Sequence, residues 1–318
     1  MKDVITVGES MVLFTPATSP MMRYAETFSK DVGGAESNVA IGLARLGHNV
    51  GWISRLGNDE FGTFILNSIR GEGVDVSQVK RDDEHPTGLY FKEIRHAKDV
   101  RVQYYRKGSA ASQITMDDID ETYWNEAKYL HLTGITPALS DTAYETMVSL
   151  MKRASTCNIN IVFDPNLRRK LWPDEKARAV LKELIGYSDF VLPGMEEAIF
   201  LFGEENPERA AELFLEAGCD QVVIKLGEKG AYYKSKNKSG FIPPHQVKEV
   251  IDPVGAGDGF AAGFISGLLD GLPTDQAVKR ANAVGAIQTQ MIGDYQGLPD
   301  REELEQFMSR KSNQDVKR

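Results

Sequence analysis

The sequence predicts an α/β fold in which helices flank a central, mostly parallel β-sheet and a smaller sheet projects from this core. Two observations predict it. Short β-branched runs that end in polar or glycine residues alternate with helical patterns along most of the chain. One region breaks this alternation with two strand-like stretches in a row. Such alternation is typical of βαβ units, and ligands of these sheets bind beyond the carboxyl ends of the strands.

The expected core strands and helices follow in chain order. The first strand is expected at residues 4–9, and others at residues 49–55, 129–133, 159–163, 190–192 and 221–226. Helices are expected between them, at residues 141–154, 174–185 and 206–217. Because β-branched side chains suit a pleated, buried surface, the short runs are assigned to the sheet.

The region that breaks the pattern covers residues 87–94 and 100–105, joined by a polar turn at residues 95–99. Polar and apolar residues alternate in both stretches, which predicts a hairpin with two different faces. With residues 12–32 it should form the small projecting sheet. We therefore assign residues 1–11, 33–86 and 107–308 to the α/β core, residues 12–32 and 87–106 to the projecting sheet, and residues 309–318 to a polar tail. The alternative is a hairpin packed on the core without a role in binding.

The composition narrows the class of protein. The chain has 318 residues, 42% hydrophobic and 26% charged, which is ordinary for a soluble globular protein. We expect a cytoplasmic location, because no apolar run approaches a membrane span, the start lacks the plan of a signal peptide, and Cys157 and Cys219 are the only cysteines. The five histidines show no zinc-ligand spacing. A net charge of −9 argues against nucleic acid, and phosphates would need Mg²⁺ and placed cations.

A glycine-rich segment at residues 252–259 carries the first chemical prediction. An apolar, β-branched stretch leads into it, so we expect a strand that empties into a turn, and the turn opens a helix. The unpaired N–H groups of Gly255, Ala256 and Gly257 would bind an anion at the helix start. Asp258 suits a general base that deprotonates a hydroxyl attacking a phosphoryl group. The alternative is that Asp258 only caps the helix.

A second glycine segment, at residues 32–47, opens a helix of small residues. Gly33 and Gly34 would let a ligand touch the backbone, and Asn38 offers a donor and an acceptor to a sugar hydroxyl. Together the two glycine segments resemble the two signatures of the PfkB, or ribokinase-like, carbohydrate kinases, and the resemblance extends over nearly the whole chain. It implies a ribokinase-like fold in which the projecting sheet is a lid over the sugar. The resemblance also implies a homo-oligomer whose subunits contact each other through the lid.

The resemblance further implies ATP with Mg²⁺, and leaves a monovalent cation open. The loop at residues 225–230 looks like the family's nucleotide loop, and helical packing would explain the small residues around Asn282 equally well. Nucleotide-binding residues implied in this way are Asn166, Lys225, Gly227, Gly230 and Asn282. Glu197 keeps the acidic place of a family metal element and would act through water, although Gly194 stands where the family has Asn. Pro253 replaces a frequent Thr.

The acceptor is inferred from groups that suit a carboxylate. Arg168 follows a strand end, and Tyr104 and Arg106 lie two residues apart on one face of the proposed lid. These segments resemble 2-keto-3-deoxygluconate kinases more than ribokinases. The sugar-acid site implied by this likeness consists of Gly34, Tyr90, Tyr104, Arg106, Arg168, Asp258 and Asp294.

The sequence thus predicts ATP-dependent phosphorylation of 2-keto-3-deoxygluconate, whose product would feed sugar-acid breakdown of the Entner–Doudoroff type. Two other functions stay open. The chain could be a fructokinase or another ketose kinase of the same family. It could also be a regulator that binds a sugar or nucleotide without catalysis, because a fold does not fix a function.

Overall fold

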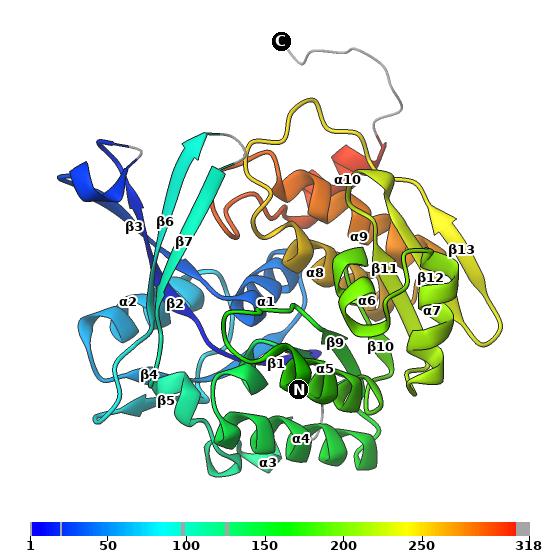
Figure 1. Cartoon of the computed structure of the whole chain (residues 1–318), viewed down its shortest axis with the longest axis horizontal. Coiled ribbons are helices and arrows are strands. Elements are labelled where there is room, and N and C mark those ends of the chain that lie inside the picture. The colour runs from blue at the N-terminus through cyan, green and yellow to red at the C-terminus, as the bar shows by residue number, and fades with distance from the viewer. Residues whose placement is uncertain (1, 20, 97–98, 125–126, 310–318) are drawn as a thin grey trace.

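The computed structural model describes residues 2–19, 21–96, 99–124 and 127–309 (Figure 1). The centre of the turn expected at residues 95–99, and the polar tail beyond residue 309, lie outside the described residues. No helix in the described part of the chain combines the length and apolarity needed to cross a membrane.

The core is a nine-stranded sheet in the order β13-β12-β11-β10-β9-β8-β1-β4-β5. All pairs from β11 to β5 are parallel, and β12 and β13 add an antiparallel edge, so the mostly parallel prediction is confirmed. The strands are β1 (Val4–Val7), β4 (Val50–Gly57), β5 (Val79–Asp82), β8 (Tyr129–Thr133), β9 (Asn160–Asp164), β10 (Phe190–Val191), β11 (Gln221–Lys225), β12 (Ala231–Ser235) and β13 (Ser239–Ile242).

Helices cover both faces of this sheet. Alternate side chains of β1 enter opposite cores: Ile5 and Val7 pack with α4, α5, α6 and α7, whereas Val4 packs with α1, α2, α8, α9 and α10. The helices are α1 (Ala35–Arg45), α2 (Glu60–Gly71), α3 (Glu121–Trp124), α4 (Asp141–Thr156), α5 (Asp174–Ile185), α6 (Met195–Phe202), α7 (Pro207–Glu216), α8 (Ala256–Leu269), α9 (Thr274–Gln288) and α10 (Arg301–Ser309). Short 3₁₀ turns lie at Met22–Tyr24, Ala110–Gln113, Met116–Asp118, Thr136–Ala138 and Gly227–Lys229.

One predicted element was wrong. No strand leads into the turn at Asp252, because β13 ends at Ile242 and the chain runs irregularly to Gly255. Two adjacent prolines, Pro243 and Pro244, follow β13 and cannot donate ladder hydrogen bonds. The β-branched residues that suggested a strand, Val250 and Ile251, are 50% and 52% exposed. Other expected elements shift by one or two residues at their ends.

The small sheet is confirmed and contains β2 (Met11–Pro16), β3 (Phe28–Gly33), β6 (Leu89–His96) and β7 (Asp99–Tyr105), in the order β3-β2-β6-β7. We call it the lid sheet. The pairs β2–β3 and β6–β7 are antiparallel, whereas β2 and β6 run parallel, with Val12 opposite Leu89. Figure 1 shows the lid sheet at the left of the view, rising above β4 and β5 of the main sheet, with α1 and α8 to its right.

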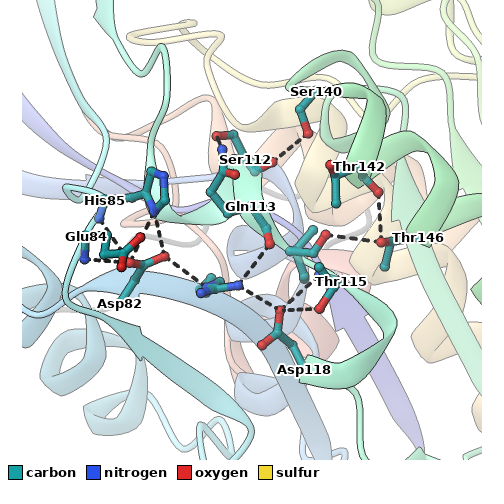
Figure 2. Close-up of polar contacts among 12 residues, drawn as sticks. Asp82, Glu84, His85, Ser112, Gln113, Thr115, Asp118, Ser140, Thr142 and Thr146 are labelled. Carbon is teal, nitrogen blue, oxygen red and sulfur yellow. Dashed lines mark hydrogen bonds and ion pairs between the residues drawn. The ribbon is translucent and has the colours of Figure 1, made fainter.

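The segment that follows the lid sheet is bonded to the core around Asp82, Gln113 and Asp118, which Figure 2 labels. Arg55 of β4 lies 3.1 Å from Asp82 (Nε to Oδ2) and 3.4 Å from Asp118 (Nη1 to Oδ2), and its Nη1 donates to the carbonyl of Gln113 at 3.0 Å. Thr146 of α4 donates to the carbonyl of Ile114 at 3.1 Å. These bonds join β4, β5 and α4 to residues 113–118. We call this group the Arg55 anchor.

Candidate active site

The inner face of the lid sheet, the start of α8 and the carboxyl ends of β1, β9 and β11 enclose a cavity of about 330 Å³. The parallel strands bring residues that are distant in sequence to this one edge, as expected for the fold. Of the predicted site residues, the cavity is lined by Gly34, Asn38, Tyr90, Tyr104, Arg106, Asn166, Arg168, Glu197, Lys225, Gly255, Gly257, Asp258 and Asp294. Ala256, Gly227, Gly230 and Asn282 do not line it.

Asp258 lies in the first turn of α8 and faces α1. The side-chain amide of Asn38 donates to Asp258 Oδ2 at 2.8 Å. Burial raises the pKa of Asp258 to about 7, aided by the negative charges of Asp164 and Asp294 and opposed by the bond from Asn38. The carbonyl oxygen Oδ1 of Asn38 is buried and has no partner among the described residues. The bond from Asn38 therefore holds the Asp258 carboxylate in one orientation, and the pKa of Asp258 suits a general base near neutral pH.

The turn before α8 depends on Gly255, whose φ of 79° lies in the left-handed region. A Cβ there would overlap the carbonyl oxygen of Asp294. The Ala256 N–H already donates to the carbonyl of Pro253 at 3.3 Å, so that N–H is partly used by the turn. At Gly257 a Cβ would find its nearest atom, Lys225 Nζ, at 3.7 Å, so the space over the helix start is open. An anion can thus approach this end of α8 closely.

The two arginines predicted to bind a carboxylate differ in their pairing. Arg106 is buried and forms an ion pair with Glu9, whose other oxygen accepts from the Ser109 hydroxyl. The guanidinium of Arg106 also lies over the ring of Tyr104, 5.5 Å from its centroid. Arg168 is exposed at the cavity, and its side chain makes no ion pair or hydrogen bond within the described residues. Arg168 is therefore the guanidinium with free capacity for an anionic ligand.

A buried lysine joins the lid sheet to the loops around the α8 start. Lys92 of β6 donates to Asp252 Oδ2 at 2.7 Å and to Asp294 Oδ1 at 3.2 Å. The Tyr90 hydroxyl donates to Asp294 Oδ2 at 2.6 Å. Gly33 lines the cavity, and a Cβ there would overlap the Tyr90 hydroxyl oxygen, so the close approach of Tyr90 to this backbone requires glycine. Both Asp294 oxygens, expected to meet a substrate hydroxyl, thus already accept protein donors.

A second lysine, Lys225, ends β11 and donates to Asp164 Oδ2 at 2.6 Å. Burial opposes its charge, but Asp164 and Glu197 outweigh that effect and raise the pKa of Lys225. Glu197 is not a solvated acidic helix start: its oxygens accept the N–H groups of Leu167 and Gly194, both at 2.7 Å. Burial, followed by the charge of Asp164, raises the pKa of Glu197. Asn166 has a φ of 37°, which asparagine tolerates.

The remaining predicted nucleotide residues lie outside the cavity. Gly230 has a φ of 91°, and a Cβ there would overlap the carbonyl of Ile242. Gly227 also has a positive φ, of 59°. The Asn282 amide donates to the carbonyls of Ile242 and Pro243, at 3.3 and 3.0 Å, and holds the chain after β13. Neighbouring small residues of α9 pack against Gly263 and Gly267 of α8, so helix packing explains them.

No group of three His, Cys, Asp or Glu side chains in the described ranges could hold a metal ion by itself. Asp164 and Glu197 are the acidic lining side chains beside Lys225. Because both Glu197 oxygens accept backbone donors, this residue fits a water-mediated contact better than direct ligation. The donor set therefore fits an ion that arrives with nucleotide phosphates.

Sequence reasoning missed Lys92, and did not assign roles to Glu9 and Asp252. A usable signal existed for Lys92. It lies two residues after Tyr90 on a lid strand, so both side chains project from the same face. Its carboxylate partners lie 160 and 202 positions away, and nothing local in the sequence indicates them.

The fold and the cavity fit the predicted class, a sugar kinase with a ribokinase-like fold. The chain belongs to the pfkB family of carbohydrate kinases, whose family model matches residues 1–301. It is 47% identical over 309 residues to 2-dehydro-3-deoxygluconokinase of Bacillus subtilis (strain 168), covering 96% of this chain and 95% of that protein. The enzyme of the same name from Thermoproteus tenax is 36% identical, covering 97% and 94%.

Solved structures agree with this assignment. A PfkB protein from Polaromonas sp. JS666 superposes with a TM-score of 0.88 at 44% identity, covering 96% of this chain and 99% of that one. An E. coli protein named as a ribokinase II, in complex with ATP and Mg²⁺, gives a TM-score of 0.89 at 27% identity, covering 98% and 100%. The predicted family and the predicted kinase class are confirmed.

Proposed function

We propose that this kinase transfers the γ-phosphoryl group of ATP to the terminal hydroxyl of 2-keto-3-deoxygluconate, also called 2-dehydro-3-deoxygluconate. The observation that carries the choice of acceptor is the unpaired Arg168 guanidinium at the cavity that also contains Asp258. A neutral ketose offers no charge to such a group, whereas the carboxylate of a sugar acid does. The names of the relatives at 47% and 36% identity support the same acceptor.

In this proposal Asp258 accepts the proton of the attacking hydroxyl. As that oxygen bonds to the γ-phosphorus, the bond from phosphorus to the ADP oxygen breaks, and the proton ends on Asp258. Asn38 keeps the receiving carboxylate turned toward the cavity through its 2.8 Å bond to Oδ2. The free N–H groups at the α8 start, with the positive end of the helix dipole, would stabilise the transferring group.

The nucleotide phosphates would lie between the α8 start and Lys225. Mg²⁺, when bound, neutralises phosphate charge, and Asp164 and Glu197 are the side chains that would hold it, Glu197 through water. Lys225 keeps its proton because of Asp164, and so provides a permanent positive charge at this position.

The test is a panel of acceptors with ATP and Mg²⁺, read by ADP release. 2-Keto-3-deoxygluconate should give the highest kcat/KM, ahead of gluconate, fructose and ribose. A preference for fructose would overturn the acceptor and leave the kinase class intact. Turnover of no acceptor by folded enzyme that still binds ATP would overturn the catalytic role of Asp258.

A further inference from the structure

The buried cluster of Lys92, Asp252, Asp294 and Tyr90 lies on the lid side of the cavity, and the proton-transfer scheme above gives it no task. Lys92 and Asp252 are 2% and 3% exposed. Burial opposes the charge of Lys92, but Asp294 and Asp252 outweigh it and raise the pKa of this lysine. The ammonium is therefore a fixed internal cation.

Asp252 connects the Lys92 ammonium to the turn before α8 through hydrogen bonds to both. Its Oδ1 accepts from the Val254 N–H at 3.1 Å, one residue before Gly255. Its Oδ2 accepts from the Gly293 N–H at 3.2 Å as well as from Lys92. The carbonyl of Asp294, the second partner of Lys92, lies against Gly255. Both carboxylates that Lys92 neutralises thus belong to chain segments that contact the turn before α8.

We propose that Lys92 is a positioning residue for phosphoryl transfer: its ammonium, supplied by the lid sheet, is the cation that orders the turn at residues 252–255. The inference rests on the proposed use of that turn for phosphate. Removing the ammonium would leave two carboxylates facing each other without a shared cation, and they would repel. The turn would then lose its geometry, although the cavity would keep Asp258 and Arg168.

The inference also bears on cation requirements. The ammonium of Lys92 is compact and already lies within hydrogen-bond distance of two carboxylates. The wild-type enzyme should therefore need no added monovalent cation at this place. A variant without the ammonium offers two carboxylates that a small free cation can bridge.

The experiment compares Lys92→Met with Lys30→Met. Lys30 is an exposed lid residue that contacts the ring of Phe64, so its variant controls for loss of a lid lysine. Lys92→Met should lower kcat by more than 100-fold with the sugar KM within threefold, and weaken ADP binding measured by calorimetry. Ammonium chloride at about 0.1 M should raise the kcat of Lys92→Met at least tenfold, whereas tetramethylammonium chloride should not raise it. Neither salt should activate wild type or Lys30→Met.

A folded Lys92→Met enzyme with kcat within threefold of wild type would overturn the inference. So would a loss that ammonium does not restore, or a rise in sugar KM alone. If Lys92→Met does not fold, Asp252→Asn decides, because Asp252 does not line the cavity. It should lower kcat more than tenfold with an unchanged sugar KM, and an unchanged kcat would overturn the inference. Failure of the proposed function looks different, since wild type would then lack activity on the sugar acid.

Discussion

The start of α8 and the Arg55 anchor both contain an aspartate, but the two carboxylates have different partners and opposite pKa shifts. In the anchor, Asp82 accepts the N–H groups of Glu84 and His85, at 2.8 and 3.0 Å, and pairs with Arg55. Although burial alone would raise it, these partners hold the pKa of Asp82 below its ordinary value. In the cavity, Asp258 has one donor and a pKa of about 7.

The arginines repeat this contrast. Arg55 contacts Asp82, Asp118 and the carbonyl of Gln113, as Figure 2 shows for the labelled partners, whereas Arg168 makes no ion pair in the described part of the chain. Paired charges fix the scaffold, and polar groups with spare capacity mark the place where a ligand completes them. Substitutions in the two regions should therefore separate activity from stability.

The largest separation is expected for Asp258→Asn. Removing the base should lower kcat by about 10² to 10⁴-fold, while the near-isosteric side chain keeps the fold and ATP binding. Steady-state kinetics, thermal melting and calorimetry with ATP check the three parts. The matched control is Asp275→Asn in the first turn of α9, which should retain activity. Activity of Asp258→Asn within a few-fold of wild type would reduce Asp258 to a helix cap.

Arg168→Ala should cost about 10- to 150-fold in kcat/KM for the sugar acid, from the loss of a charged hydrogen bond of about 1.5–3 kcal/mol. Its melting temperature should stay unchanged, because the side chain is exposed. The neighbouring Arg169→Ala is the control, since Arg169 pairs with Asp174 on the surface. Equal losses on 2-keto-3-deoxygluconate and on a neutral ketose would mean that Arg168 holds phosphate instead.

Arg106→Ala should behave differently from Arg168→Ala, although the sequence suggested the same role for both. It would leave the buried Glu9 without its counter-charge, so the protein should melt at a lower temperature as well as lose activity. An unchanged melting temperature for Arg106→Ala would remove the distinction between the two arginines.

The pH dependence should follow from the pKa of about 7 at Asp258. The base must be ionised, so kcat/KM should fall about tenfold for each pH unit below that value. Stability runs the opposite way. Because the folded pKa lies above the ordinary aspartate pKa of 3.8, the stabilisation from protonated Asp258 is fully present below pH 3.8 and is lost as pH rises through about 7. Melting curves of wild type and Asp258→Asn between pH 4 and 8 should diverge accordingly.

The smallest effect on activity is expected at Arg55. Arg55→Met should lower the free energy of unfolding by about 1–3 kcal/mol, because Asp82 and Asp118 lose their shared cation. Since the Arg55 anchor lies outside the cavity, kcat should stay within twofold of wild type. Denaturant unfolding and kinetics on the same preparation measure both quantities. A large loss of kcat without a loss of stability would show that the anchor acts on the site.

The sequence predicted features that depend on local chain chemistry. Glycines followed by an aspartate define the start of α8, so Asp258 could be found without coordinates. The end of a predicted strand pointed to Arg168, and the resemblance of the loop at residues 225–230 to the family's nucleotide loop pointed to Lys225. Pairing across the fold could not be predicted, since Arg106 and Glu9, or Lys92 and Asp252, are joined only by tertiary structure. The expected strand before Asp252 failed because β propensity does not distinguish a buried run from an exposed loop.

The parallel pairing of β2 with β6 has a consequence for the order of folding. These strands are separated along the chain by β3, α1, β4, α2 and β5, yet they lie side by side in the lid sheet. The two can meet only after the intervening α/β unit has brought their ends together, because closing so long a loop is costly before the core exists. The lid sheet should therefore assemble late and open first. Backbone amides of β2 and β6 should exchange with solvent deuterium faster than those of β1 and β8.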